Sequence, residues 1–323
     1  MIVYYCKNSK NIDDLYVISI LPYPGIRSYA FLTPHKKIMW FLFMIFRGLA
    51  MNNSNRILHL QGVLNARELG GLLLKCNRAV KHGKIIRTGR LSNLTVEDRK
   101  QLKDIWHVTR IVDLRNNREV SEYPDMELEG AVYQQISIIP GELDGISRQD
   151  DGMDPIDRAI IRAENLHKNG GAKGLLEGMY GQMAADDYCA ERIKEFFDMM
   201  LDLEDGAFIW HCTSGKDRTG VTGGLMLYAL GADMETIKED YLYTNIQNRQ
   251  HRETVLDMMK AKKASNIRVE EIRILESVDW AYMESFFDGI KAKYGSVDNF
   301  LSQRIGLDEE KLKKLAEKYT EKI

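Results

Sequence analysis

The residues best suited to do chemistry lie in one run, His-Cys-Thr-Ser-Gly-Lys-Asp-Arg-Thr-Gly, at positions 211–220. An apolar run at 207–210 precedes it and is typical of a buried strand, and a helical pattern begins near Val221. The five residues between Cys212 and Arg218 can form a loop whose backbone N–H groups all face one anion. The run therefore predicts a phosphate-binding loop between a strand and a helix.

Two side chains of this loop would have complementary chemistry. The field at a helix N-terminus lowers the pKa of a nearby thiol, so we expect Cys212 to be a thiolate at neutral pH. The guanidinium of Arg218 can bind two phosphoryl oxygens at once, which a lysine cannot do. A thiolate beside a bound phosphate predicts hydrolysis of phosphate monoesters through a covalent phosphocysteine.

The loop resembles the signature loop of the cysteine-dependent tyrosine phosphatases. Its form, His-Cys-x-x-Gly-Lys-Asp-Arg-Thr-Gly, is similar to that of the bacterial branch with broad phosphotyrosine, phosphoserine/threonine and phosphoinositide activity. Four other segments match motifs of that branch in the same order: Asn65-Ala66-Arg67-Glu68-Leu69-Gly70-Gly71, Ile86-Arg87-Thr88-Gly89-Arg90-Leu91-Ser92, Val112-Asp113-Leu114-Arg115 with Glu119, and Asp240-Tyr241-Leu242 with Asn245. The resemblance extends from Ile57 to the C-terminus. Ala66 and Glu68 depart from the family's Phe and Asp, and neither carries the chemistry.

The resemblance and the chemistry together predict the roles of the site residues. Cys212 is the expected nucleophile, and Arg218 and the loop N–H groups are expected to bind the phosphoryl oxygens. The phosphate-binding residues would be Thr213, Ser214, Gly215, Lys216, Asp217, Arg218 and Thr219. Many relatives use an acid on a Trp-Pro-Asp loop, and that tripeptide does not occur here. The resemblance to the bacterial branch indicates Asp217 as the general acid. Asp113 is the second candidate and equally plausible as an ion-pair partner of Arg115 or Arg218.

Other functions and roles remain open at this point. One is a phosphate-recognition module whose hydrolysis is incidental, and another is a rhodanese-like sulfurtransferase, which does not call for the Gly-Lys-Asp-Arg-Thr-Gly ending. Lys216 could contact an extra phosphate of an inositol ring or the flank of a phosphopeptide. His211 is expected to support the loop by hydrogen bonding. Cys6, Cys76 and Cys189 are expected to be small core residues.

Composition, net charge and cysteine count limit the class to which this protein can belong. The chain has 323 residues, of which 44% are apolar and 28% charged, as in ordinary soluble globular proteins. A net charge of −2 gives no sign of a nucleic-acid or membrane partner. Four cysteines without close pairing suit a reducing, cytoplasmic compartment, and no metal-ligand spacing occurs. We therefore expect no metal or cofactor, and a phosphorylated protein or phosphoinositide as substrate. The oligomeric state does not follow from the sequence.

The first fifty residues differ from the rest. They hold three of the six prolines and six Lys or Arg against two Asp, and residues 38–46 form an apolar run of nine. Nine residues are too few to span a bilayer, which needs about 20. The favoured interpretation is that translation begins at Met51 and residues 1–50 are an over-extended reading frame. A membrane tether or an export signal within residues 36–50 is an alternative.

From Leu58 onward, strands and helices alternate, which predicts an α/β fold of the tyrosine-phosphatase type over residues 51–323. Strands are expected at 84–88, 109–114, 132–139 and around Phe208 in a central, mostly parallel sheet flanked by helices. Helices are expected at 96–105, capped by Thr95, and at 175–203. The C-terminal part should be helical, with Met283, Phe286, Phe287 and Ile290 on one buried face and Gly295 at its end.

Residues 141–171 are an insertion that follows a strand. A helix should run from Pro155 to about Lys168 with Asp154 as its N-cap, and Gly170 and Gly171 should end it. Long insertions in compact domains are usually functional or disordered. Because this one leaves the carboxyl end of a strand, the pattern favours a movable helical lid on the active-site side over a plain surface insertion.

Overall fold

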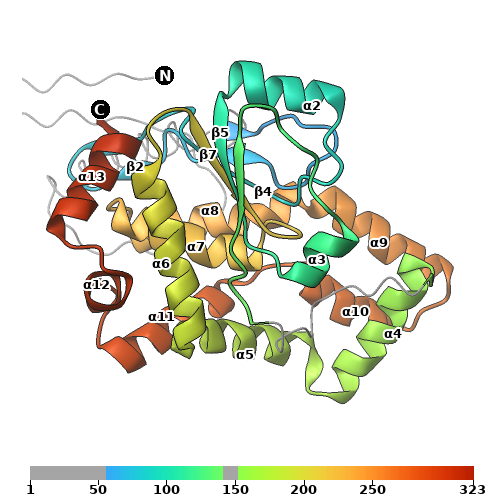
Figure 1. Ribbon diagram of the computed structural model, residues 1–323. Helices are drawn as coiled ribbons and strands as arrows, with labels where there is room; N and C mark the ends of the chain where they lie inside the picture. The colour runs from blue at the N-terminus through green and yellow to red at the C-terminus, as the bar shows by residue number, and fades with distance from the viewer. Residues whose placement is uncertain (1–55, 141–151) are drawn as a thin grey trace, which may run out of the picture. The chain divides into compact units, whose positions relative to one another are not determined.

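A computed structural model describes residues 56–140 and 152–323 (Figure 1). The predicted extension at residues 1–50 and the first part of the predicted lid, residues 141–151, lie outside the described residues. Within the described residues, no helix combines the length and the apolar character that crossing a bilayer requires.

Five strands form the central sheet in the order β1-β4-β7-β5-β6. They are β1 (Arg67–Glu68), β4 (Ile85–Thr88), β5 (Val108–Asp113), β6 (Val132–Gln135) and β7 (Ala207–His211). β4, β7, β5 and β6 run parallel, and only β1 pairs antiparallel, with β4. A second, antiparallel sheet joins β2 (Leu73–Leu74), β3 (Arg78–Val80) and β8 (Thr320–Lys322). The predicted mostly parallel α/β sheet is confirmed.

Side chains that alternate along β7 divide the core into two parts. All five residues of β7 are buried, because the strand has a parallel neighbour on each side and packed side chains on both faces of the sheet. Phe208 and Trp210 belong to the larger core with α5 (Gly171–Ala185), α6 (Asp187–Asp202), α7 (Asp217–Ala229) and α11 (Trp280–Tyr294). Ala207 and Ile209 face the smaller core beside α2 (Val96–Lys100). Figure 1 shows α2 and α6 on opposite sides of the sheet.

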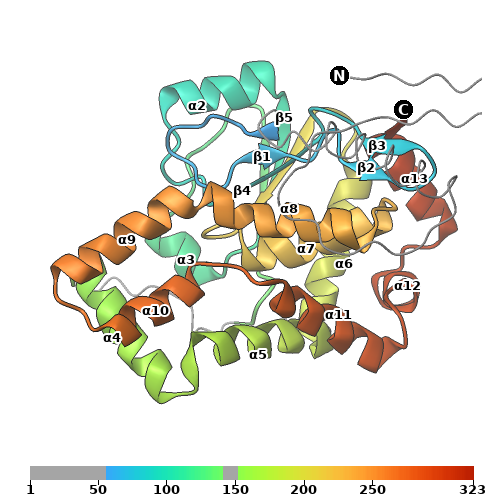
Figure 2. The same ribbon diagram turned by 180° about the vertical axis from the view of Figure 1, so that it is seen from behind.

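Helices make up most of the remaining chain. Before β7 these are α2 (Val96–Lys100), which continues into the π-helical η2 (Gln101–Ile105), α3 (Asn117–Glu122), α4 (Pro155–Lys168), α5 (Gly171–Ala185) and α6 (Asp187–Asp202). After β7 come α7 (Asp217–Ala229), α8 (Met234–Gln247), α9 (Arg249–Ala261), α10 (Asn266–Leu275), α11 (Trp280–Tyr294), α12 (Val297–Asn299), η4 (Phe300–Ile305) and α13 (Glu309–Tyr319). Figure 2 shows α8 running beside α7.

The capping residues confirm several predicted helix boundaries. Thr95 accepts the amide of Asp98 in a capping box, and Asp154 accepts the amides of Ile156 and Asp157. The predicted apolar face of α11 is buried, and Gly295 ends that helix at a φ of 81°. The predicted helical C-terminal part is therefore present.

Three local predictions were wrong. The expected helix at 175–203 is two helices, because Asp186 is extended and its carboxylate caps the start of α6. The strand expected at 132–139 ends at Gln135, because its partner β5 ends at Asp113. Cys76 is exposed rather than buried, because it has a φ of 58° in the tight turn between β2 and β3. Cys189 is buried as expected, and Cys6 lies outside the described residues.

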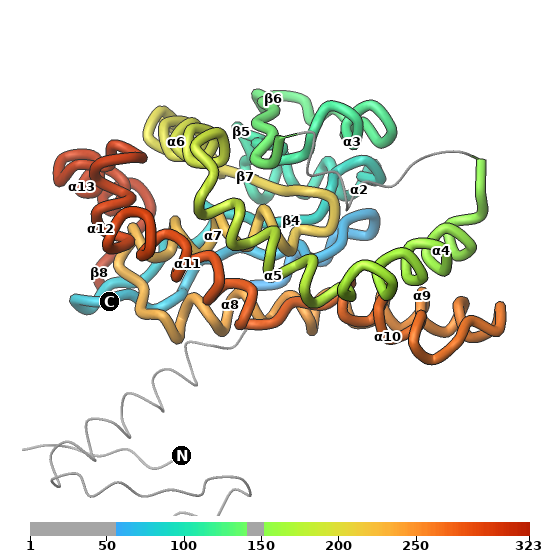
Figure 3. Tube along the Cα trace, turned by 90° about the horizontal axis from the view of Figure 1, so that it is seen from below, coloured from blue at the N-terminus to red at the C-terminus, as the bar shows by residue number. Residues whose placement is uncertain are grey.

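The helix predicted within the insertion packs on the C-terminal helices. Figure 3 shows α4 alongside α9 and α10, which it contacts. Lys262, at the end of α9, lies 2.8 Å from both Asp154 and Asp157, and Arg268 of α10 lies 2.6 Å from Glu164. α4 is thus docked by ion pairs on half-exposed side chains, which salt would weaken.

Candidate active site

Cys212 lies at the carboxyl end of the central strand. β7 lies between β4 and β5, which run parallel to it, and it ends at His211, while α7 begins at Asp217. In open α/β sheets, ligands bind at this edge. Residues 212–216 therefore form a loop between a buried strand and a helix N-terminus, as the sequence predicts.

The carbonyl groups of this loop are bound from outside it. Thr213 O accepts the Arg90 amide at 3.2 Å. Ser214 O accepts from the side chains of Asn65 at 3.4 Å and Asn248 at 3.3 Å, and Gly215 O accepts from those of Asn65 at 2.7 Å and Arg87 at 3.0 Å. Outward carbonyls leave the loop amides to face an anion.

Gly215 is required by the shape of the loop. Its φ is +66°, which favours glycine, and a Cβ at this position would lie 2.4 Å from Thr88 O. The loop thus packs directly on the end of β4, so no side chain fits between them.

A buried arginine cluster supports the loop from behind. Asp240 of α8 pairs with Arg87 at 2.7 Å, Arg67 at 3.0 Å and Arg56 at 3.3 Å, and all four are at most 3% exposed. Burial disfavours a charged Asp240, but the three guanidinium groups outweigh it and hold its pKa well below the ordinary value. Because Arg87 also binds Gly215 O, Asp240 fixes the loop through a single intermediate side chain.

Cys212 is 2% exposed, and its surroundings favour the thiolate. Burial alone would raise the pKa of the thiol. The Arg218 guanidinium and the hydroxyl and amide of Thr219 outweigh burial, so the pKa is lowered. The chemistry that the sequence predicts for Cys212 thus has a physical basis in the loop.

Arg218 is held by a carboxylate from another element. Glu119 of α3 accepts from Arg218 Nη1 at 2.5 Å and Nη2 at 2.7 Å, and from the Thr213 hydroxyl at 2.5 Å. Burial opposes ionisation of Glu119, but these donors outweigh it and lower its pKa to about 2. Glu119 is therefore a carboxylate across the physiological range and fixes the orientation of Arg218.

Asp217 and Asp113 have different surroundings. Asp217 is 7% exposed, and its carboxylate lies 2.6 Å from Lys216 Nζ and 2.9 Å from the Tyr180 hydroxyl. Asp113 is fully buried and accepts from Arg115 Nε and Nη2 and from the Tyr133 hydroxyl. Burial disfavours an ionised Asp113, but His211 and Arg115 outweigh it and lower its pKa to about 2.

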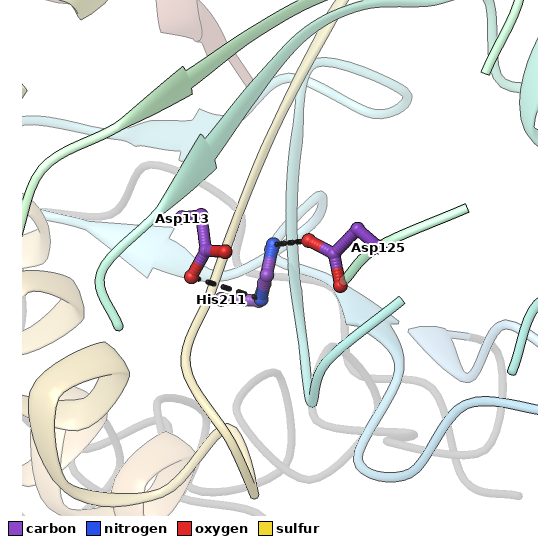
Figure 4. Close-up of side chains that lie close together, drawn as sticks. All are labelled: Asp113, Asp125 and His211. Atoms are coloured by element: carbon purple, nitrogen blue, oxygen red, sulfur yellow. Dashed lines mark ion pairs between the residues drawn. The ribbon is translucent and has the colours of Figure 1, made fainter. Parts of the chain in front are cut away.

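Asp113 belongs to a buried charge network beneath the loop (Figure 4). His211 Nε2 lies 2.9 Å from Asp125, and its Nδ1 lies 3.8 Å from Asp113. Burial would lower the pKa of His211, but the two carboxylates outweigh it and raise it. Each of these three side chains offers an atom of a kind that binds metals, and the three atoms lie within 4.8 Å of one another. However, Arg115 Nη2 lies between the two carboxylates, 2.7 Å from Asp113 and 2.9 Å from Asp125. The positive charges of Arg115 and His211 thus balance the negative charges of Asp113 and Asp125.

Comparison with known proteins agrees with this geometry. The family model described as the tyrosine phosphatase family matches residues 58–321. The chain belongs to the tyrosine phosphatase family. It is similar to a protein of Cupriavidus necator that bears the name "putative tyrosine-protein phosphatase", with 28% identity over 76% of this chain and 83% of the relative. It is also similar to the triple specificity protein phosphatase PtpB of Mycobacterium tuberculosis, with 25% identity over 69% of this chain and 86% of the relative.

The predicted site residues of this phosphatase come together with one exception. Cys212, Arg218 and the residues predicted to bind phosphate lie in the loop and the first turn of α7, whereas Asp113 lies in the network beneath the loop. Sequence reasoning assigned no role to Tyr180, Asn248 or Asp125, and cited Glu119 only as part of a motif. Tyr180, Glu119 and Asn248 lie 37, 99 and 34 positions from their partners Asp217, Arg218 and Ser214, so no local pattern connects them.

Proposed function

We propose that this phosphatase hydrolyses phosphotyrosine through a phosphocysteine intermediate. The observation that carries the proposal is a lowered-pKa thiol, Cys212, beside a guanidinium that Glu119 orients, within a loop whose carbonyls are bound from outside. In the first step, Cys212 Sγ attacks phosphorus, the S–P bond forms and the bond to the ester oxygen breaks. Arg218 and the loop amides stabilise the negative charge on the phosphoryl oxygens.

The leaving oxygen needs a proton, and we assign its donation to Asp217. Asp217 begins α7 beside Arg218, next to the loop that we propose binds the phosphoryl group. Asp113 accepts hydrogen bonds from Arg115 and Tyr133 and has a pKa of about 2, so it is a poor proton donor at neutral pH. In the second step, water attacks phosphorus, Asp217 takes up its proton, and the Thr219 hydroxyl stabilises the departing thiolate.

Phosphoserine/threonine and phosphoinositides are proposed as further substrates. The Mycobacterium tuberculosis relative is named a triple specificity protein phosphatase, which supports a broad range. Lys216 is 5% exposed and donates to Asp217 Oδ1 at 2.8 Å. It would contact a second phosphate of an inositol ring or an acidic residue beside the phosphoamino acid.

Turnover of p-nitrophenyl phosphate in EDTA tests the proposal. Wild type should turn over and should be inhibited by vanadate, while Cys212→Ser should bind phosphate without turnover. A phosphate-recognition module would bind with wild-type turnover no greater than that of Cys212→Ser. A rhodanese-like enzyme would instead transfer sulfur from thiosulfate to cyanide, which this phosphatase should not do.

A further inference from the structure

Three tyrosines from three helices form a cluster, and one of them, Tyr180, contacts Asp217. Tyr180 of α5 donates its hydroxyl hydrogen to Asp217 Oδ1 at 2.9 Å and lies 2.8 Å from the Tyr241 hydroxyl of α8. The Tyr180 ring packs edge-on against the Tyr241 ring, with centroids 6.4 Å apart, and against Tyr282 of α11 at 5.8 Å. All three are at most 3% exposed, so the rings fix the position of the Tyr180 hydroxyl.

The two hydrogen bonds of this cluster run in the same direction, from Tyr241 to Tyr180 and from Tyr180 to Asp217. Tyr180 has a single hydroxyl hydrogen, which the carboxylate receives, so Tyr241 must donate to Tyr180. Burial, and next the charge of Asp217, raise the pKa of both tyrosines well above the ordinary value, so both hydroxyls stay protonated and act as donors. Hydrogen bonds that follow one another in this way polarise each other, so each bond is stronger than it would be alone.

The two oxygens of Asp217 have different partners. Oδ1 accepts from Tyr180 and from Lys216 at 2.8 Å, whereas Oδ2 contacts Lys216 at 2.6 Å. The charged and titratable groups that act on Asp217, or on which it acts, are Cys212, Lys216 and Arg218 of its own loop and Tyr180, Tyr241 and Tyr282 of the packed helices. Tyr180 is the neutral donor that contacts Oδ1, and a bound phosphate dianion would draw the Lys216 ammonium away from Oδ2.

We infer that Tyr180, supported by Tyr241, is the positioning residue of the general acid Asp217. The inference rests on the proposed function. Tyr180 holds Oδ1, which leaves Oδ2 to carry the proton toward the leaving oxygen. As the S–P bond forms, the electron pair of the breaking P–O bond takes the proton of Asp217 Oδ2, and Tyr180 keeps its own proton throughout.

Tyr180→Phe removes the hydroxyl and keeps the ring. It should lower kcat for phosphotyrosine about tenfold, as expected for a lost hydrogen bond to a charged group, and change turnover of an activated aryl phosphate about twofold at most. The carboxylate loses a donor, so the basic limb of the kcat/KM profile should move to higher pH. Tyr241→Phe should show the same selectivity more weakly. Tyr319→Phe is the matched control, because its buried hydroxyl binds Met200 O away from the loop, and both substrates should be unaffected.

The effect must also depend on the acid. In an Asp217→Asn background, Tyr180→Phe should add no further loss for phosphotyrosine. Equal losses for both substrates with an unmoved basic limb, or additive losses in the double variant, would overturn the inference. If Tyr180→Phe does not fold, Tyr241→Phe decides by the same selectivity. If Asp217→Asn itself shows no dependence on the leaving group, the proposed acid fails, and that outcome is distinct from failure of Tyr180 alone.

Discussion

Arg218 in the first turn of α7 and Glu119 of α3 form a forked ion pair, with Nη1–Oε2 at 2.5 Å and Nη2–Oε1 at 2.7 Å. The two residues are 99 positions apart in sequence and are 7% and 8% exposed. The pair orients a buried guanidinium before any substrate arrives, so binding does not have to order it.

Glu119→Gln should weaken that orientation while keeping the size of the side chain. We expect kcat/KM for p-nitrophenyl phosphate to fall on the order of tenfold to a hundredfold, because Arg218 loses its charged partner. Urea unfolding should show a loss of about 2 kcal/mol, typical of a hydrogen bond to a charged group. Unchanged kinetics would show that the loop alone orients Arg218.

The same pair makes stability depend on pH. The pKa of Glu119 is about 2 in the folded protein, below about 4.3 for an unperturbed glutamate. A carboxylate with a lowered folded pKa stabilises the fold above its unfolded pKa, and this contribution is lost as pH falls through the folded value. The free-energy difference between wild type and Glu119→Gln should therefore be constant near neutrality and shrink between about pH 5 and about pH 2. A difference that does not shrink would contradict the ion pair.

Arg218→Lys tests the bidentate contact with phosphate. A lysine is a point charge, so kcat/KM should fall on the order of a hundredfold to a thousandfold, as for loss of a transition-state donor. Arg118→Lys is the control, because Arg118 is a half-exposed residue of α3 that pairs with Glu122. Steady-state measurement of kcat and KM for both variants compares their effects. Near wild-type kcat in Arg218→Lys would mean that the guanidinium does not bind the transferred phosphoryl group.

Asp217→Asn and Asp113→Asn should fail in different ways. Asp217→Asn should reduce phosphotyrosine turnover far more than turnover of an activated aryl ester, because only the poor leaving group needs a proton. Asp113→Asn removes one of the two carboxylates that pair with the buried Arg115, so Asp125 alone remains to balance Arg115 and His211, and it should cost about 3 kcal/mol of unfolding free energy. Its effect on turnover per folded molecule should be equal for both substrates. The reverse pattern would move the acid to Asp113.

Gly215→Ala should damage the loop itself. The added Cβ would lie 2.4 Å from Thr88 O, so the loop must shift away from β4 and phosphate affinity should fall. Gly231→Ala is the matched control, with a φ of 93° and no atom within 4 Å of the added Cβ, so it isolates backbone strain of about 1 kcal/mol. Phosphate titration and thermal melting separate the two effects. Equal behaviour of the two variants would mean that the close approach to Thr88 is unimportant.

Local patterns in the sequence were sufficient to predict the strand, loop and helix around Cys212 and the caps at Thr95 and Asp154. These features depend on neighbouring residues, so they can be read from short segments. Glu119, Tyr180 and Asn248 reach the loop from distant helices, and tertiary packing alone brings them there. Local chemistry also explains an error, because Asp186 is an N-cap residue inside an apparently continuous helical run.

The central claim is a covalent phosphocysteine, and trapping it tests the account most directly. Wild type should be mixed with phosphotyrosine substrate carrying radiolabelled phosphate, quenched in acid within one turnover and digested. The account predicts label on the peptide that contains Cys212, and no label on any peptide of Cys212→Ser. Label on another residue, or turnover with no labelled peptide and full activity in Cys212→Ser, would contradict it.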